Sequence, residues 1–290
     1  ALENTVKSFT VYVFNNATGV LEKSQTFNNT LNGEMSGLSV ASAKKVVVFV
    51  NQPASYSAIA NYSDFAGASA MISIDSQVPG DFSTNGLFMS GEYPTAVQLS
   101  AANVVNVPVT VERLTAKIRL GSLTVTPDAN LSLGDFVITG VSAPLVRDKA
   151  RALGTLASSG FGYVSAVVPS GDQGGAVVKS FLNSPYTLPG GYTAGTTLNP
   201  EAYFYVFPND DADNKVTMLN IYGTYLGEPM YFPFVINAEA STEGGNTTDG
   251  TWIQRNMVYT LNVHLKKIGS GSDNHNLPNA EVSMEVKVSV

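Results

Sequence analysis

Strict alternation of apolar and polar residues is the sequence feature that most restricts how this chain can fold. It is clearest in residues 280–290 (AEVSMEVKVSV), where every second position is apolar. Those positions are Val282, Met284, Val286, Val288 and Val290. Because successive side chains of a strand point to opposite faces of a sheet, the pattern predicts a β-strand with one buried face. The strand runs to the last residue, so it completes either a sheet of its own chain or a sheet of another molecule.

Similar strand signals recur along the whole chain, separated by turn-forming glycine, proline and asparagine residues. The predicted strands are 6–15, 44–52, 95–100, 106–126, 135–143, 203–209, 216–226, 230–237 and 258–268. The pair 216–226 and 230–237 predicts a hairpin closed by Gly227, Glu228 and Pro229. One helix is predicted over 54–73. Because no long amphipathic helices alternate with the strands, we expect an all-β fold with a minor helix.

The two halves of the sequence are similar in pattern. A strand rich in valine or aromatic residues occurs in each half, at 44–53 and at 201–210. Arg113 and Arg255 are each followed by a long alternating strand, and each could join strand ends through charge-assisted hydrogen bonds, a structural role. This repetition predicts two β-sandwich domains in tandem, an N-terminal domain over 1–130 and a C-terminal domain over 131–290.

The composition excludes several classes of protein. Charged residues make up only 13% and the net charge is −7, whereas nucleic-acid binding needs clustered Lys and Arg. Cysteine is absent, so no disulfide supports the core. No run approaches the ~18 apolar residues of a membrane-spanning helix. The sequence opens directly into a strand signal, and we expect that it begins at a processed end.

Residues that could support catalysis or metal binding are few and scattered. His264 lies on the polar side of a predicted strand and His275 in a loop, so two unpaired histidines without cysteine do not predict a zinc site. The acidic stretch 208–215 lacks the glycine and terminal glutamate of a calcium-binding EF-hand loop. Trp252 could contribute to a sugar-binding platform, but aromatic residues on strands are more often part of the core. The carboxylates that could in principle form a glycosidase pair are Asp135, Glu201, Glu228 and Glu239. We predict no catalytic residue, no metal site and no cofactor, and therefore no enzyme.

Four segments resemble a known family. They are VERLTAKIRL (111–120), KKVVVFVNQP (44–53), WIQRNMVYTLNVHLKKIG (252–269) and the terminal AEVSMEVKVSV. Together they are similar to the fimbrillins, the major fimbrial subunits of Bacteroidetes, also called type V pilins. The order of the segments along the chain also agrees with that family.

The resemblance implies a fold and a function. Fimbrillins fold as two transthyretin-like Greek-key β-sandwich domains and are exported as lipoproteins to the outer membrane. An arginine-specific surface protease removes an N-terminal segment that includes the first strand, and a strand from another subunit fills the groove. The expected protein is thus an extracellular pilin subunit whose partners are other copies or related subunits. It is expected to polymerise by donor-strand exchange into fimbriae that mediate adhesion. Receptors on host or bacterial surfaces are further expected partners. The alternative is a fimbrial tip or accessory adhesin, or a glycan-binding surface lipoprotein, on the same fold.

The sequence departs from the family pattern at its end. Major subunits typically continue past the equivalent of the terminal strand into a further segment that acts as the donor, whereas this sequence stops at Val290. One hypothesis is that 282–290 pairs inside its own C-terminal domain and a missing tail is the donor. The other is that 282–290 itself enters a neighbouring subunit. We favour the first, because 269–279 is long enough to return the chain to its own sheet.

Overall fold

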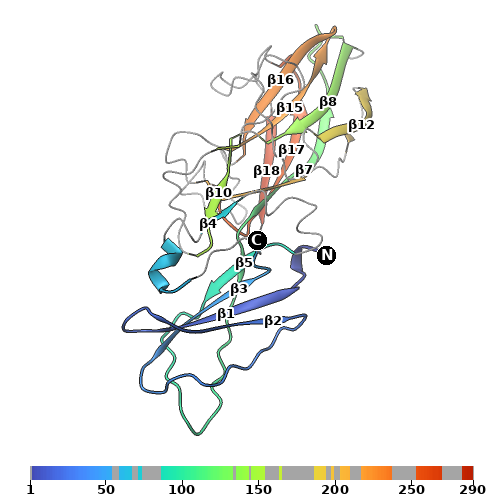
Figure 1. The fold of residues 1–290 in the computed structure, drawn as a ribbon. Coiled ribbons are helices and arrows are strands. Elements are labelled where there is room, and N and C mark those ends of the chain that lie inside the picture. Colours follow the sequence, from blue (N-terminus) through green and yellow to red (C-terminus); the bar gives the residue numbers. More distant parts are fainter. Residues whose placement is uncertain are drawn as a thin grey trace. The chain divides into compact units, whose positions relative to one another are not determined.

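The chain folds almost entirely into β-sheet, as a computed structural model shows (Figure 1). The structure describes residues 2–53, 59–66, 71–73, 86–132, 135–143, 145–153, 163–164, 186–193, 197–198, 203–209, 217–236, 253–269 and 283–289. Within these ranges the helical elements are two short 3-10 turns, η1 (Leu2–Asn4) and η2 (Tyr62–Ala66). The expected all-β fold is therefore confirmed. None of the helical segments in these ranges is long and apolar enough to cross a membrane.

The chain divides into two compact units. Unit 1 comprises Ala1–Thr115 and Lys149–Leu156, and unit 2 comprises Ala116–Asp148 and Ala157–Val290. The strands of unit 1 are β1 (Ser8–Asn15), β2 (Leu21–Asn28), β3 (Lys44–Val50), β4 (Met71–Ser73), β5 (Met89–Glu92), β6 (Glu112–Arg113) and β10 (Lys149–Arg151). The predicted domain ranges, 1–130 and 131–290, are a separate division of the chain and stay a proposal.

Unit 1 is built on a five-stranded antiparallel sheet in the order β2-β1-β3-β5-β6. β1 and β3 form its centre because both are rich in β-branched and aromatic residues, which suit a pleated sheet that is buried. Phe14 and Phe49 are fully buried, and the rings of both meet Phe65 of η2 at centroid distances of 5.6 and 5.1 Å. Such aromatic pairs contribute about 0.5–1.5 kcal/mol beyond the burial of their area. The short strands β4 and β10 pair separately.

Unit 2 contains the remaining strands. They are β7 (Ala116–Val125), β8 (Phe136–Ser142), β9 (Val146–Arg147), β11 (Tyr163–Val164), β12 (Tyr186–Thr193), β13 (Thr197–Leu198), β14 (Tyr203–Val206), β15 (Met218–Tyr225), β16 (Glu228–Val235), β17 (Val258–Leu265) and β18 (Ser283–Ser289). One sheet has the order β12-β8-β15-β16, and the other has the order β13-β7-β17-β18, with β14 also pairing with β7. β7 and β17 run parallel to each other.

β17 follows the predicted alternation, whereas β15 and β16 are buried over runs of successive residues. Every second residue of β17 is buried, which is the pattern that the sequence 258–268 predicts. Leu261 of β17, Leu120 of β7 and Ile221 of β15 are fully buried. The short polar residues between the buried positions of β17 are only half-buried, so one face of its sheet carries the core.

The helix predicted over 54–73 is wrong where the structure describes it. Residues 62–66 form η2, and Met71–Ser73 form β4, which pairs with β10. Asp64 caps the start of this turn, since its Oδ2 accepts hydrogen bonds from the backbone N–H groups of Ala60 and Asn61. The helix does not extend to Met71, because Met71–Ser73 pair with β10 instead.

Three strand predictions also need correction. The single strand predicted over 106–126 is divided, because pairing begins at β6 and the chain bends at Leu114 before β7. The strand predicted over 95–100 is reduced to one bridge between Val97 and Lys44. The hairpin between β15 and β16 turns at Leu226 and Gly227, one residue earlier than predicted. Both residues have positive φ (53° and 84°), as a two-residue hairpin turn requires.

Candidate polymerisation edge

The predicted terminal strand forms β18 and lies beside β17 of the same chain. The two strands are antiparallel, with Met284 opposite Val263, Val286 opposite Leu261 and Val288 opposite Tyr259. Val282 and Val290 lie outside the described residues. A role of these five residues in polymerisation stays a prediction.

The two predicted arginines both lie near the start of a strand. Arg113 is in β6, where its Nε donates to the carbonyl of Glu3 at 3.3 Å and its Nη2 donates to Asn4 Oδ1. Arg113 thus ties the first residues of unit 1 to the edge of the sheet. Arg255 lies in the turn that precedes β17. The proposed structural role of both residues stays a prediction.

The described residues offer little to catalysis or metal binding. No group of three His, Asp or Glu side chains that could hold a metal occurs in the described ranges. His264 lies in β17 and is hydrogen-bonded to Thr126. Asp135 precedes β8, and Glu228 begins β16. The candidates outside the described residues are His275, Trp252, Glu201, Glu239 and most of the acidic stretch, 210–215.

An unpaired segment, residues 103–111, leads into β6. None of its residues forms a hydrogen bond in the part of the chain that the structure describes. Its exposure nevertheless alternates, since Val107, Val109 and Val111 are half-buried and the residues between them are exposed. Val105 continues the same row with 37% of its surface exposed. This alternation is typical of an extended strand, so we name residues 103–111 the free edge.

The free edge lacks the features that normally protect a sheet edge. Residues 93–111, which join β5 to β6, include no Asp, Glu, Lys or Arg. Natural proteins usually protect edge strands with charged side chains or a covering segment. Val104 is instead 84% exposed. An uncharged strand with unpaired backbone groups is suited to pairing with an extended segment of another chain.

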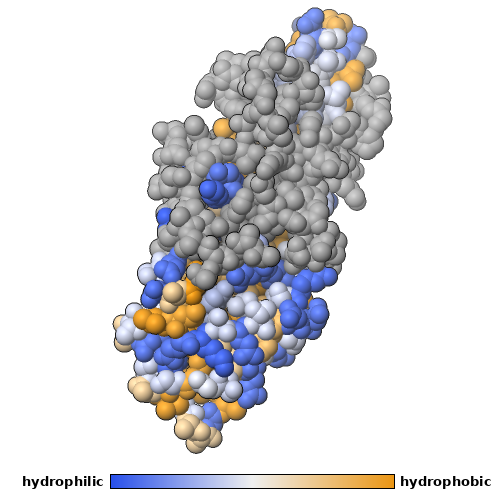
Figure 2. All heavy atoms as spheres, in the orientation of Figure 1, coloured by the Kyte–Doolittle hydropathy of each residue, from blue (hydrophilic) through white to orange (hydrophobic). Residues whose placement is uncertain are grey.

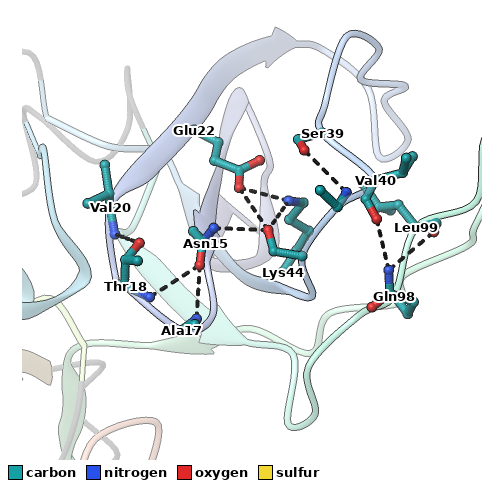
Figure 3. Close-up of polar contacts among 12 residues, drawn as sticks. Asn15, Ala17, Thr18, Val20, Glu22, Ser39, Val40, Lys44, Gln98 and Leu99 are labelled. Atoms are coloured by element: carbon teal, nitrogen blue, oxygen red, sulfur yellow. Dashed lines mark hydrogen bonds and ion pairs between the residues drawn. The ribbon is translucent and has the colours of Figure 1, made fainter.

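The opposite edge of the same sheet, β2, is charged and covered. Lys44 Nζ donates to Glu22 Oε1 at 2.7 Å and to Ser42 Oγ at 2.8 Å, and Asn15 Nδ2 donates to the same Oγ at 2.9 Å (Figure 3). The Lys44 side chain is only 1% exposed. This network joins β1, β2 and β3 by charge-assisted hydrogen bonds.

A loop also packs along β2. Lys23 Nζ donates to the carbonyl of Ser36 at 2.6 Å. A Cβ added to Gly33 would lie 2.6 Å from the ring of Phe27, so the backbone of Gly33 packs directly on that ring. The edge at β2 is therefore occupied by the protein's own chain over part of its length.

The end of unit 1 beside β6 is held together by one buried side chain, Asn51. Its Oδ1 accepts a hydrogen bond from Lys7 N at 2.8 Å, and its Nδ2 donates to the carbonyls of Thr5 and Leu87 at 2.8 and 3.0 Å. Asn51 has a φ of 55°, a left-handed conformation that asparagine tolerates better than most residues. Asn51 and Arg113 together fix the chain before β1 at the end of the sheet where β6 lies.

Figure 2 shows one face of the molecule coloured by hydropathy, and apolar side chains are visible on the surface of unit 1. Among the described residues the large apolar side chains with the highest exposure are Val104 at 84%, Leu31 at 77% and Leu226 at 67%. Val104 belongs to the free edge and Leu226 to the tip of the β15–β16 hairpin. Sequence reasoning missed the free edge because it took 106–126 as one paired strand. The signals available were the absence of charge over 93–111 and the proline inside the run, Pro108.

The sequence and the fold were compared with those of known proteins. Residues 2–133 match the family model described as the major fimbrial subunit protein (FimA). This is a family of structural fimbrial subunits and not a class of enzymes. No curated protein matches the sequence.

Solved structures from Bacteroidales share the fold over nearly the whole chain. A protein described as a "putative cell adhesion protein" from Bacteroides eggerthii has a TM-score of 0.68 at 17% identity, covering 98% of this chain and 88% of that chain. A fimbrilin (FimA) from Porphyromonas gingivalis has a TM-score of 0.66 at 18% identity, covering 99% and 90%. The tip fimbrial protein Mfa3 from the same organism, with a C-terminal truncation, has a TM-score of 0.51 at 14% identity, covering 99% and 94%. The predicted resemblance to the fimbrillin family is therefore confirmed over residues 2–133 by the family model. The fold of the solved structures is shared over nearly the whole chain.

Proposed function

We propose that this protein is a structural subunit of a cell-surface fimbria and polymerises by taking up a β-strand from another copy. The observation that carries the proposal is the free edge, 103–111, an extended and uncharged segment without a hydrogen bond in the described part of the chain. In strand addition the main-chain hydrogen bonds supply affinity, and alternate side chains fill pockets. Such head-to-tail contacts do not close, so they continue as a filament.

The energy available from one added strand is adequate for a durable fibre. If five apolar side chains of an incoming strand were buried at about 1.5–3 kcal/mol each, the gross gain would be about 7–15 kcal/mol before the cost of association. The half-buried valines of the free edge, at 107, 109 and 111, would lose their remaining exposure at the same time. No covalent link between subunits is needed.

Two segments remain candidates for the donor. The pairing of β18 with β17 supports the view that residues 282–290 complete the sheet of their own unit and that a further segment is the donor. In the other version β18 leaves β17 and enters a neighbouring copy. As the resemblance implies, the precursor is lipid-anchored at the outer membrane and an arginine-specific protease exposes the acceptor edge.

The experiment is an assembly assay with the purified chain and with a variant that lacks residues 280–290. Filaments are followed by sedimentation and electron microscopy after treatment of the precursor with an arginine-specific protease. If β18 is the donor, the truncated chain no longer assembles by itself but still adds to intact chains. If a further segment is the donor, a chain that carries it assembles with or without 280–290, provided that unit 2 stays folded. A processed subunit that stays monomeric under all of these conditions would overturn the proposal.

A further inference from the structure

The connection between β5 and β6 contains two prolines at positions that the register places opposite each other. The β5–β6 ladder consists of Met89 opposite Arg113 and Ser90 opposite Glu112. Continued by four residues along each strand, the same register places Pro94 opposite Pro108. The two prolines are 14 residues apart in the sequence, so their opposite positions become apparent only from the β5–β6 register.

The backbone hydrogen bonds show which kind of pair the two prolines occupy. Leu114 N donates to the carbonyl of Phe88 at 3.0 Å, so residues 88 and 114 form a hydrogen-bonded pair. Hydrogen-bonded pairs recur at every second residue of an antiparallel ladder. The pair 94 and 108 would therefore be a hydrogen-bonded pair, in which each residue donates its N–H to the other. Proline has no N–H, so neither bond can form, and the ladder cannot continue through this point.

The two limbs of the connection part before the prolines are reached (the green loop in Figure 1), since the ladder ends at Ser90 and Glu112 and no hydrogen bond joins the described residues Glu92 and Thr110. The prolines remove the next hydrogen-bonded pair as well. The near limb, residues 93–98, stays beside β3, since Tyr93 N donates to Val46 O at 2.9 Å and Val97 exchanges two hydrogen bonds with Lys44 at 2.7 and 2.8 Å. The far limb is the free edge, 103–111. The last close approach is at Gly91, where an added Cβ would lie 2.0 Å from the carbonyl oxygen of Thr110. We name the two limbs together the fork.

The two rows of backbone groups that face into the fork are both unpaired. Tyr93 points its N–H toward β3, and Val97 points both its N–H and its C=O toward β3, so the backbone groups of Ala96 and Gln98, the neighbours of Val97, point away from β3. Residue 114 points its N–H toward β5, so the backbone groups of Asn106 and Thr110 point toward the near limb. None of these four backbone N–H groups forms a hydrogen bond in the described part of the chain.

We propose that Pro94 and Pro108 hold the fork open and that the strand taken up from another copy inserts between its two limbs. The occupant is a second copy, because both limbs lack charge although each copy carries a net charge of −7. Repulsion between two acidic copies is therefore weakest where the fork receives a strand. The inference rests on the proposed polymerisation. It adds the position of the incoming strand, between the two limbs, and the residues that keep the limbs apart, Pro94 and Pro108.

The first test is amide hydrogen exchange, measured residue by residue by NMR. Exchange is carried out in the monomer and in assembled filaments, and the filaments are dissolved afterwards for the NMR measurement. The amides of Ala96, Gln98, Asn106 and Thr110 are expected to exchange rapidly in the monomer and at least tenfold more slowly in filaments. If the slowed amides are instead those of Val105, Val107 and Val109, the strand adds to the outer side of the free edge. That result would overturn insertion into the fork and leave the proposed polymerisation intact.

The second test replaces both prolines, in the variant Pro94→Thr/Pro108→Thr. The ladder is then expected to close, so the amides introduced at positions 94 and 108 exchange slowly in the monomer and the assembly rate falls at least tenfold. The matched control is Pro229→Thr in β16, which lies outside the fork and should leave assembly unchanged. If the introduced amides exchange rapidly, or if the double variant assembles like the wild type, the prolines do not hold the fork open. If the wild type itself does not assemble, polymerisation fails, and the monomer exchange data still decide whether the prolines separate the limbs.

Discussion

The five-stranded sheet of unit 1 ends in β2 on one side and in β6 with the free edge on the other. β2 carries Glu22 and Lys23, shares a buried ion pair with β3 and is covered in part by the loop around Gly33. The free edge has no charge, no covering hydrogen bond in the described part of the chain, and exposed valines.

The two edges of the unit 1 sheet differ in charge and in cover, so an unprotected edge is not a property that both sides of this sheet share. The same sheet protects one edge by the devices that natural proteins use against unwanted pairing. A protein that lacked a partner strand would be expected to protect both. The contrast supports the proposal that the free edge is the part of unit 1 that receives a strand from another chain.

The largest expected effect comes from breaking the protected edge with Lys44→Met. The carboxylate of Glu22 would be left without its cation in a mostly buried site, and unfolding free energy should fall by about 3–5 kcal/mol. Urea denaturation measures this loss. The control Lys23→Met removes a more exposed lysine of β2 and should change stability by less than about 1 kcal/mol. Equal losses in the two variants would show that the buried pair does not secure this edge.

A charge on the free edge should act on assembly and leave the monomer intact. In Val109→Lys the ammonium would be carried into the interface with the incoming strand, and a cost of about 3 kcal/mol corresponds to a roughly hundredfold weaker association. Sedimentation of filaments and the thermal unfolding of the monomer are the two measurements. The matched control, Ser24→Lys, places the same charge on an exposed position of β2 and should assemble normally. Normal assembly of Val109→Lys would remove the free edge from the interface.

Gly91→Ala tests how closely the free edge must approach β5. Because an added Cβ would meet the carbonyl of Thr110 at 2.0 Å, the backbone has to shift, and we expect a loss of about 1–3 kcal/mol. Thermal or urea unfolding measures it. Thr95→Ala, an exposed change in the near limb, should stay within about 0.5 kcal/mol of the wild type. Wild-type stability of Gly91→Ala would mean that Thr110 does not need to lie so close.

The smallest effect concerns the turn that adjoins the start of β2. Hydrogen bonds from the backbone of Asn61 and Ala60 lower the pKa of Asp64 below its ordinary value of 3.8. Because the pKa of the folded state is the lower one, the stabilisation is present above about pH 3.8 and is lost as the pH falls through the folded value. Asp64→Asn should therefore unfold at a slightly lower temperature than the wild type at pH 7, and the two curves should converge at acidic pH. A difference between them that is independent of pH would exclude the carboxylate as its cause.

The sequence was sufficient for the fold class because alternation is a local signal. The strand at 258–268 was predictable from its period-two pattern, and β17 shows that pattern in its burial. The strand at 216–226 was predicted as well, although β15 is buried at successive residues from Met218 to Gly223. The structure that replaces the helix predicted over 54–73 could not be predicted from the sequence. Asp64 caps only a short turn, and Met71 pairs with a strand, β10, that is distant in sequence. Propensity alone does not contain such tertiary pairing.

The candidate site was predictable only in part. The terminal strand was found as a strand, whereas its partner, β17, depends on a register that no local pattern states. The free edge was mistaken for a paired strand because valine alternation looks the same with and without a neighbour. Pro108 and the missing charges were visible in the sequence, but the relation of Pro108 to Pro94 depends on the observed β5–β6 register.

The free edge leads through β6 and the bend at Leu114 into β7, which has β17 on one side and β13 and β14 on the other. A pulling force on a strand held at the free edge would thus reach a central strand of unit 2 within a few residues. A force that acts along β7 loads many backbone hydrogen bonds at once, because these bonds lie perpendicular to the strand. A fimbria built from such subunits would resist tension by shear, whereas an edge strand would peel away one bond at a time.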